Sequence, residues 1–298
     1  MKRLIASILF LPLGGIAQTS LPPATFADIS YGPHERNKLD LWQAKSAMPT
    51  PLVVFVHGGG WAGGDKKDAL PKLHAFLIAH GVSFASINYR YSTTAILPVP
   101  VHDAARAVQF LRSKAAGWNL DPAHFGAYGV SAGGCTTLWL ALHDDLADHK
   151  SADPVAQQST RLQAAVGVAP QTSLEPHVVS EWIGNKVLQH PMIGRAVGLK
   201  KGETLLQPKP EWTRLLAEFS PINHVSRDDP PLLLAFTHDD PLPAASAGSA
   251  IHHALFGRKL REKALSVGAN CIVRIEDEKP GEDIPKPEAF LLRALMVK

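Results

Sequence analysis

The sequence predicts an α/β protein with a mostly parallel central sheet and helices on both faces. Short apolar runs rich in β-branched residues alternate with longer segments of helical apolar spacing along nearly the whole chain. This alternation is typical of βαβ units joined by right-handed crossovers. The 298 residues are 45% hydrophobic and 19% charged, which suits a chain that buries a sizeable core. We therefore expect one large domain.

The elements follow from periodicity and from turn residues. A hairpin is expected over residues 27–41, around a Gly-Pro turn, and the further strands are expected over 52–56, 82–91, 125–130, 162–168, 232–236 and 271–275. Helices are expected over 69–80, 102–115, 132–143, 251–267 and 287–295. In such sheets, ligands bind at the carboxyl ends of the strands.

Residues 171–220 break this alternation. The segment contains Trp182, Trp212 and several prolines, and its helical pattern is weak. We expect it to form a lid over the site, inserted into the single domain.

The N-terminus has the pattern of an export signal. A positive start at Lys2 and Arg3 precedes an apolar stretch over residues 4–17 that ends in small residues. We expect residues 1–17 to be removed and residues 18–298 to be exported as the mature domain. No other segment reaches about 18 unbroken apolar residues, so no membrane span is expected.

Charge and cysteine content narrow the range of partners. With 30 basic and 27 acidic residues, the chain carries no charge excess typical of nucleic-acid binding. Cys135 and Cys271 both lie in apolar segments, and we expect buried thiols rather than a disulfide. Two cysteines give no metal-site spacing, and the sequence implies no metal and no organic cofactor.

The first motif that carries chemistry is Gly129-Val130-Ser131-Ala132-Gly133, which lies between an expected strand and an expected helix. This G-x-S-x-G pattern in that context predicts a nucleophile elbow. The sharp turn demands small neighbours and exposes the Ser131 hydroxyl at a helix N-terminus, where a developing oxyanion is stabilised. An ordinary glycine-rich turn is the alternative reading.

The second motif is His57-Gly58-Gly59-Gly60-Trp61, after the expected strand over 52–56. Consecutive glycines let backbone N–H groups turn toward a substrate oxygen. We expect His57 to hold the loop in place rather than to carry a proton. Trp61 is expected either to pack beneath the loop or to line the substrate site. Phosphate binding is disfavoured, because no Walker lysine or G-x-G-x-x-G is present.

Together these motifs resemble the α/β-hydrolase superfamily, in its hormone-sensitive-lipase-like and feruloyl/acetyl-xylan-esterase-like serine esterase branches. The resemblance extends over nearly the whole mature chain and includes residues 39–42, 88–91, 220–225 and 229–231. It implies that the amides of Gly59, Gly60 and Ala132 form the oxyanion hole. It also places the catalytic acid after the strand over 232–236, which indicates Asp240, with Asp239 as the alternative. Asp240 would orient an imidazole, although Asp-Asp-Pro is also a common turn.

The sequence departs from the family at the catalytic histidine. The resemblance places this residue after the last strand, between 277 and 287, where there is no histidine. Without a base, a serine hydroxyl is a poor nucleophile. Three accounts remain open: His252 or His253 supplies the base, a lid histidine such as His177 does so, or hydrolysis has been lost. A carboxylate base such as Glu278 or Glu282 is less apt because its free pKa is low, and His238 is a weaker candidate.

The favoured interpretation is a serine hydrolase that cleaves a carboxylic ester through an acyl-enzyme. The resemblance implies a small acyl group, including esters carried on carbohydrate. An amidase or peptidase on the same fold is one alternative. A non-catalytic binding protein is the other, and it would be favoured if neither His252 nor His253 lay within about 4 Å of Ser131. Sequence alone does not decide between these.

Overall fold

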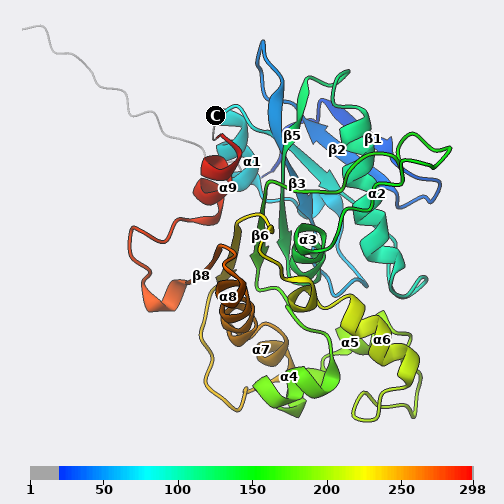
Figure 1. Cartoon of the computed structure of the whole chain (residues 1–298), viewed down its shortest axis with the longest axis vertical. Helices are drawn as coiled ribbons and strands as arrows, with labels where there is room; N and C mark the ends of the chain where they lie inside the picture. The colour runs from blue at the N-terminus through cyan, green and yellow to red at the C-terminus, as the bar shows by residue number, and fades with distance from the viewer. Residues whose placement is uncertain (1–19, 297–298) are drawn as a thin grey trace, which may run out of the picture.

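The computed structural model describes residues 20–296, which form one sheet of eight strands in the order β1-β2-β4-β3-β5-β6-β7-β8 (Figure 1). The strands are β1 (Phe26–Ser30), β2 (Lys38–Trp42), β3 (Thr50–Val56), β4 (Ser83–Ile87), β5 (Leu120–Val130), β6 (Ala164–Val168), β7 (Leu232–Phe236) and β8 (Cys271–Ile275). The expected export signal over residues 1–17 lies outside the described residues.

The sheet is parallel except at one edge. β2 pairs antiparallel with β1 and with β4, while all neighbouring pairs from β4 to β8 are parallel. Val56, the last residue of β3, pairs with Gly129 near the end of β5. The loops that follow these two strands therefore leave the sheet side by side, at the point where the strand order reverses.

Helices cover both faces of the sheet. The α-helices are α1 (Pro71–Ala79), α2 (Val99–Ser113), α3 (Ala132–Leu142), α4 (Pro176–Ile183), α5 (Pro191–Ala196), α6 (Pro210–Glu218), α7 (Ala247–Ile251), α8 (Leu255–Val267) and α9 (Pro287–Leu295). Short 3₁₀ turns are η1 (Lys66–Asp68), η2 (Asn185–Gln189), η3 (Pro221–His224) and η4 (Glu276–Glu278). The core contacts place α2, α3 and α8 on one face and α1 and α9 on the other.

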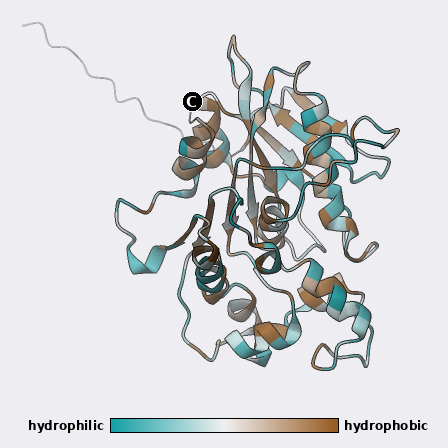
Figure 2. Cartoon of the chain, in the orientation of Figure 1, coloured by the Kyte–Doolittle hydropathy of each residue, from teal (hydrophilic) through white to brown (hydrophobic). Residues whose placement is uncertain are grey.

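Strand alternation explains the two cores. In β3, Leu52, Val54 and Val56 pack with α2 and α3, whereas Val53 and Phe55 pack with α1 and α9. A strand buried on both faces must be apolar at every position, which is why β3 reads as a continuous apolar run. Figure 2 shows the central strands and α3 as mostly hydrophobic and the peripheral loops as mostly hydrophilic. The predicted α/β architecture is confirmed.

The sequence prediction is wrong for the single helix over 251–267. The structure has two helices, α7 and α8, with a break at residues 252–254. An unbroken helix would join the Leu255 amide to the Ile251 carbonyl. Instead, the Leu255 amide donates to His253 Nδ1 at 3.0 Å, and the Ile251 carbonyl accepts from Gln171 Nε2 at 2.7 Å. Both ends of that helical bond are thus used elsewhere.

The segment between β6 and β7 carries α4, η2, α5, α6 and η3, and it lies at the same end of the sheet as α7 (Figure 1). Lys186 in η2 donates to the carbonyls of Ala244 and Ala245, just before α7, at 2.9 and 3.1 Å. Cys135 and Cys271 are buried and unpaired, as expected. Of the helices within residues 20–296, none is long and apolar enough to span a membrane.

Candidate active site

Ser131 occupies the turn between β5 and α3 with a strained backbone. Its φ of 53° and ψ of −121° lie in a region that few non-glycine residues adopt. The turn is held from both sides: the Ser131 amide donates to the carbonyl of Val168 in β6 at 2.8 Å, and the Ser131 carbonyl accepts from the amide of Cys135 at 2.9 Å. This geometry is that of a nucleophile elbow.

The glycines around Ser131 have a steric reason. A Cβ on Gly129 would collide with the carbonyl oxygen of Gly133. A Cβ on Gly133 would collide with the carbonyl oxygens of Val56 and His57. The first turn of α3 thus packs directly against the end of β3, and only glycine allows that approach.

His252 is the histidine that reaches Ser131. Its Nε2 lies 2.9 Å from Ser131 Oγ, and its Nδ1 lies 3.0 Å from the carbonyl oxygen of Gly248. A carbonyl oxygen can only accept, so Nδ1 carries the proton and Nε2 presents its lone pair to the serine. The serine hydroxyl then donates to Nε2. This is the tautomer that a general base requires.

The end of α7 positions this imidazole. His252 is the C-cap of α7, and its own amide bonds to the carbonyl of Ala250. The last carbonyls of a helix lack intrahelical partners, and the His252 ring satisfies that of Gly248. Gln171 supports the same segment because its side-chain amide holds the carbonyl of Ile251, the preceding residue, at 2.7 Å. Gln171 is fully buried, so this support is shielded from water.

Burial sets the protonation state of the site. Desolvation lowers the pKa of His252 below its ordinary value of 6.5, although the hydrogen bond to the Gly248 carbonyl acts in the opposite direction. The free imidazole is therefore neutral at neutral pH. A neutral imidazole can accept the serine proton.

The other candidate bases lie elsewhere. His253 is buried and accepts from the amide of Leu255, and among the described residues no hydrogen bond joins it to Ser131. His177 is exposed on α4, and Glu278 is paired with Arg258 at 2.5 Å. His238 pairs with Asp277 at 2.6 Å in an exposed contact between the loops after β7 and β8.

The expected carboxylate partner of the histidine is not found. Within residues 20–296, no hydrogen bond or ion pair joins Asp240 to His252, whose Nδ1 is taken by the carbonyl of Gly248. Asp239 pairs with Arg258 at 2.7 Å instead. The structure thus does not bring Asp240 to His252, and the role of Asp240 as the acid stays a prediction. The physical reason is that His252 precedes β8 and approaches from α7, where a helix-end carbonyl is already within reach.

The loop after β3 lies beside the elbow. A Cβ on Gly58 would stand 3.5 Å from the Cβ of Ser131. Gly59 and Gly60 have φ of +94° and +60°, which favour glycine, and a Cβ on Gly59 would also collide with the carbonyl of Gly63. Among the described residues, the amides of Gly59, Gly60 and Ala132 donate no hydrogen bond, which leaves them free for a ligand.

Buried aromatic residues hold this loop. The Tyr89 hydroxyl donates to the carbonyls of His57 and Gly58 at 2.8 and 3.0 Å, and its ring stacks on His57. Burial lowers the pKa of His57 to about 4, so His57 is neutral. Trp61 has no exposed surface, and its indole donates to Thr136 Oγ1 at 2.9 Å. Trp61 thus packs beneath the loop, the first of its two expected positions, and does not line a substrate surface.

Two residues of the β6–β7 segment lie next to the site, and the sequence analysis did not identify them. The ring of His190 is 6.2 Å from that of His252, centroid to centroid. The side chain of Met192 is the nearest group to Gly60, with its Cβ 3.6 Å from where a glycine Cβ would stand. Gly248 and Gln171 were missed as well. No spacing in the sequence marks them, since they act through a backbone carbonyl and through a long-range contact.

Comparison with known proteins agrees with this geometry. The family model described as BD-FAE matches residues 39–255, which include the glycine loop over 57–61, Ser131 and His252. Residues 39–255 make up most of the chain.

Curated relatives are similar over about three quarters of the chain. The probable carboxylic ester hydrolase LipM of Mycobacterium tuberculosis is 29% identical over 222 residues, 72% of this chain and 48% of that protein. The probable isoprenylcysteine alpha-carbonyl methylesterase ICMEL1 of Arabidopsis thaliana is 26% identical over 78% of this chain and 48% of that protein. The chain spans about half the length of these curated relatives.

A solved structure shows the same fold. A truncated carbohydrate esterase from gut microbiota superposes with a TM-score of 0.70 at 19% identity, over 92% of this chain and 99% of that one. The α/β-hydrolase fold that the two motifs predicted is thereby confirmed.

Proposed function

Since this chain belongs to the BD-FAE family, we propose that it hydrolyses carboxylic esters through an acyl-enzyme formed on Ser131. One observation carries the proposal: the bond of 2.9 Å between Ser131 Oγ and the unprotonated Nε2 of His252. In this proposal His252 is the general base, in place of the histidine that is missing from the loop after β8. The ester hydrolase names of the relatives support the same reaction class.

The first half of the reaction forms the acyl-enzyme. Ser131 Oγ attacks the ester carbonyl while its proton moves to His252 Nε2. The tetrahedral intermediate places its oxyanion among the amides of Gly59, Gly60 and Ala132, at the N-terminus of α3. These donors already point at the developing charge, so the protein does not have to reorganise during the reaction. Collapse breaks the bond to the alcohol oxygen, and His252 returns the proton to that leaving group.

The second half repeats these roles with water. His252 takes a proton from a water molecule that attacks the acyl carbon, and the same amides hold the second oxyanion. The collapse frees the acid and restores the serine hydroxyl. Throughout, the carbonyl of Gly248 holds the Nδ1 proton, so the ring keeps one tautomer.

The acyl group is proposed to be short. Met192 stands over Gly60 on the oxyanion loop, which limits the depth beside Ser131. The ring of His190, 6.2 Å from that of His252, takes up further space beside the reacting groups. An ester carried on carbohydrate is the proposed substrate class, which the similarity to a carbohydrate esterase supports.

The test is hydrolysis of nitrophenyl esters from acetate to octanoate by the mature protein and three variants. We expect Ser131→Ala and His252→Ala each to lower kcat by about 10³-fold or more. Asp240→Asn is the matched control and is expected to change kcat less than about tenfold, because a carbonyl orients the ring. The wild type should prefer acetate to octanoate.

One outcome would contradict the proposed reaction, and another would contradict the role given to Gly248. If the wild type is inert on every ester, the non-catalytic alternative gains, although the short Ser131–His252 contact argues against it. If Asp240→Asn is as inactive as His252→Ala, the carboxylate closes on the histidine during turnover and the assignment to Gly248 is wrong.

We also propose that the protein acts outside the cytoplasm, because residues 1–17 have the pattern of an export signal. The intact mass of the exported protein should correspond to a chain beginning near Gln18. A mass that retains residues 1–17 would contradict this.

A further inference from the structure

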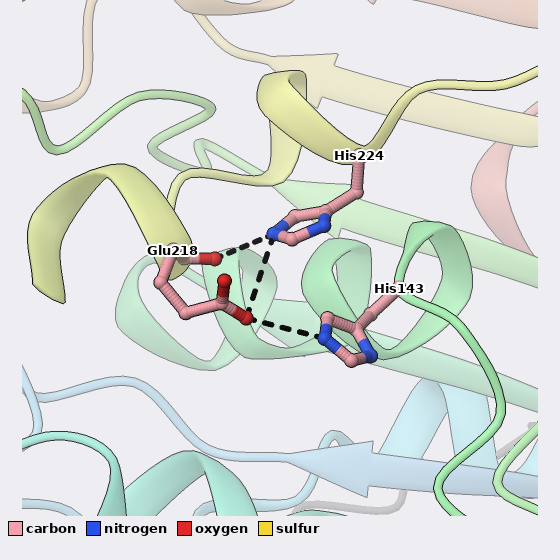
Figure 3. A group of neighbouring side chains, drawn as sticks. All are labelled: His143, Glu218 and His224. Atoms are coloured by element: carbon pink, nitrogen blue, oxygen red, sulfur yellow. Dashed lines mark hydrogen bonds and ion pairs between the residues drawn. The ribbon is translucent and has the colours of Figure 1, made fainter. Parts of the chain in front are cut away.

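We propose that His143, Glu218 and His224 form a site for a divalent transition-metal ion, separate from the catalytic residues. The three side chains come from the end of α3, the end of α6 and the end of η3 (Figure 3). Their possible ligand atoms all lie within 4.8 Å of one another. Because His143 lies 75 residues before Glu218, no spacing marks the three residues as a group.

The donor set and its geometry suit zinc. Glu218 Oε1 lies 3.2 Å from His143 Nε2 and 3.9 Å from His224 Nε2. Two ligands of a tetrahedral zinc, each about 2.0–2.2 Å from the metal, stand about 3.4 Å apart. Two imidazoles and one carboxylate are a common protein set for such an ion, with water completing the coordination.

The tautomer of His143 favours a cation at this point. Its Nδ1 lies 2.8 Å from the carbonyl of Asp144 and therefore carries a proton. In the neutral ring, Nε2 then directs a lone pair at the Glu218 carboxylate. Metal-binding histidines usually have this arrangement, with the distal nitrogen donating to a carbonyl.

To bind a metal ion through Nε2, His224 would have to give up one hydrogen bond. Its Nε2 lies 2.5 Å from the backbone carbonyl of Glu218, and metal binding would replace that bond. The carbonyl would not be left without a partner, because it also accepts from the indole of Trp139 at 2.9 Å. The exchange therefore leaves no buried polar group unsatisfied.

The surroundings hold the ligands in place while leaving them accessible. The ring of His143 stacks on Trp139 at 4.2 Å, and Trp139 stacks on Phe219, next to Glu218. The Glu218 side chain is 48% exposed, so an ion can enter from solvent. A bound ion would tie the end of the β6–β7 segment to the C-terminal end of α3, the helix that follows Ser131.

The experiment measures zinc binding to chelator-stripped protein without a histidine tag. We expect one equivalent of Zn²⁺ to bind at micromolar or lower free concentration and to raise Tm by several degrees. Co²⁺ in its place should give the visible absorption of a nitrogen- and oxygen-bound ion. Ser131→Ala should bind zinc as the wild type does, which separates this site from the proposed hydrolysis.

The variants are chosen to keep the fold. His143→Phe retains an aromatic ring against Trp139, and Glu218→Gln retains the shape of the side chain. Each should weaken zinc binding at least tenfold. His149→Ala, which removes an exposed histidine that follows α3 in the chain, should leave binding unchanged. If the wild type binds no stoichiometric zinc, or if binding persists in both ligand variants, the three residues form an ordinary histidine–glutamate contact and the proposal is wrong.

Discussion

A carbonyl oxygen and a carboxylate stabilise an imidazolium to different degrees, and His252 has the weaker partner. The Gly248 carbonyl fixes the tautomer, as a carboxylate would, but it brings only a partial charge to the cation formed in the transition state. Esters release good leaving groups and need less help from the acid form of the base than amides do. The weaker stabilisation of the imidazolium therefore favours ester hydrolysis over amide hydrolysis, the first alternative that the sequence left open.

The pH dependence of turnover follows from the same residue. Burial lowers the pKa of His252 below 6.5, and only the unprotonated ring can accept the serine proton. As the pH falls through that lowered pKa, the base is lost, so the acid limb of kcat/KM should have its midpoint below 6.5. A pH–rate profile with nitrophenyl acetate, corrected for spontaneous hydrolysis, measures it. A midpoint at or above 7 would show that the ring is stabilised as a cation.

At the scale of elements, α7 orients the His252 ring through a backbone carbonyl, that of Gly248, and not through a side chain. Gly248 has no unusual φ, and a Cβ there would meet only Ser246 Oγ at an ordinary 3.7 Å. Gly248→Ala should therefore stabilise α7 by about 0.5–1 kcal/mol and leave kcat nearly unchanged. Thermal unfolding and nitrophenyl acetate turnover check both parts. A loss of activity would mean that the position needs glycine for catalysis.

Ion pairs anchor the segments that follow the glycine loop over residues 57–61. Lys66 in η1 is buried and donates to Asp40 in β2 at 2.6 Å, with Asp28 at 2.9 Å. Arg90, just after β4, forms a two-pronged contact with Asp103 in α2 at 2.7 and 2.8 Å. The first pair holds η1 against β2, and the second holds the loop after β4 against α2. Asp40 and Arg90 both lie in segments, residues 39–42 and 88–91, that carry the resemblance to serine esterases.

Local patterns predicted most elements but not the source of the base. β7, β8 and α9 have the predicted bounds, because apolar runs and the proline at the start of α9 are local signals. Ser131 and the glycine loop could be recognised for the same reason. The break between α7 and α8 could not, because it depends on Gln171, 80 residues earlier in the chain. Which of His252 and His253 faces the serine is decided by that break.

At the scale of the whole molecule, the two thiols report on global unfolding. Cys135 and Cys271 are 1% and 4% exposed, and burial raises the pKa of both, that of Cys271 to about 12. Neither should react with a maleimide in native buffer. Across a urea titration, labelling measured by mass spectrometry should rise together with the loss of circular dichroism.

A matched control calibrates this experiment. Met48 is 71% exposed, so Met48→Cys should be labelled at once in the folded protein. Rapid native labelling of Cys135 or Cys271 would show that the core opens locally, well before the chain unfolds.

The position of His252 ahead of β8 has a practical consequence for the last part of the chain. In an esterase whose histidine follows the last strand, the loop there cannot be altered without loss of turnover. Here that loop, residues 276–283, is exposed except at the half-buried Pro280, and under the proposed mechanism it supplies no reacting group. A peptide tag or linker grafted between Gly281 and Glu282 would thus offer a point for immobilising the protein on a support while the reacting groups stay intact.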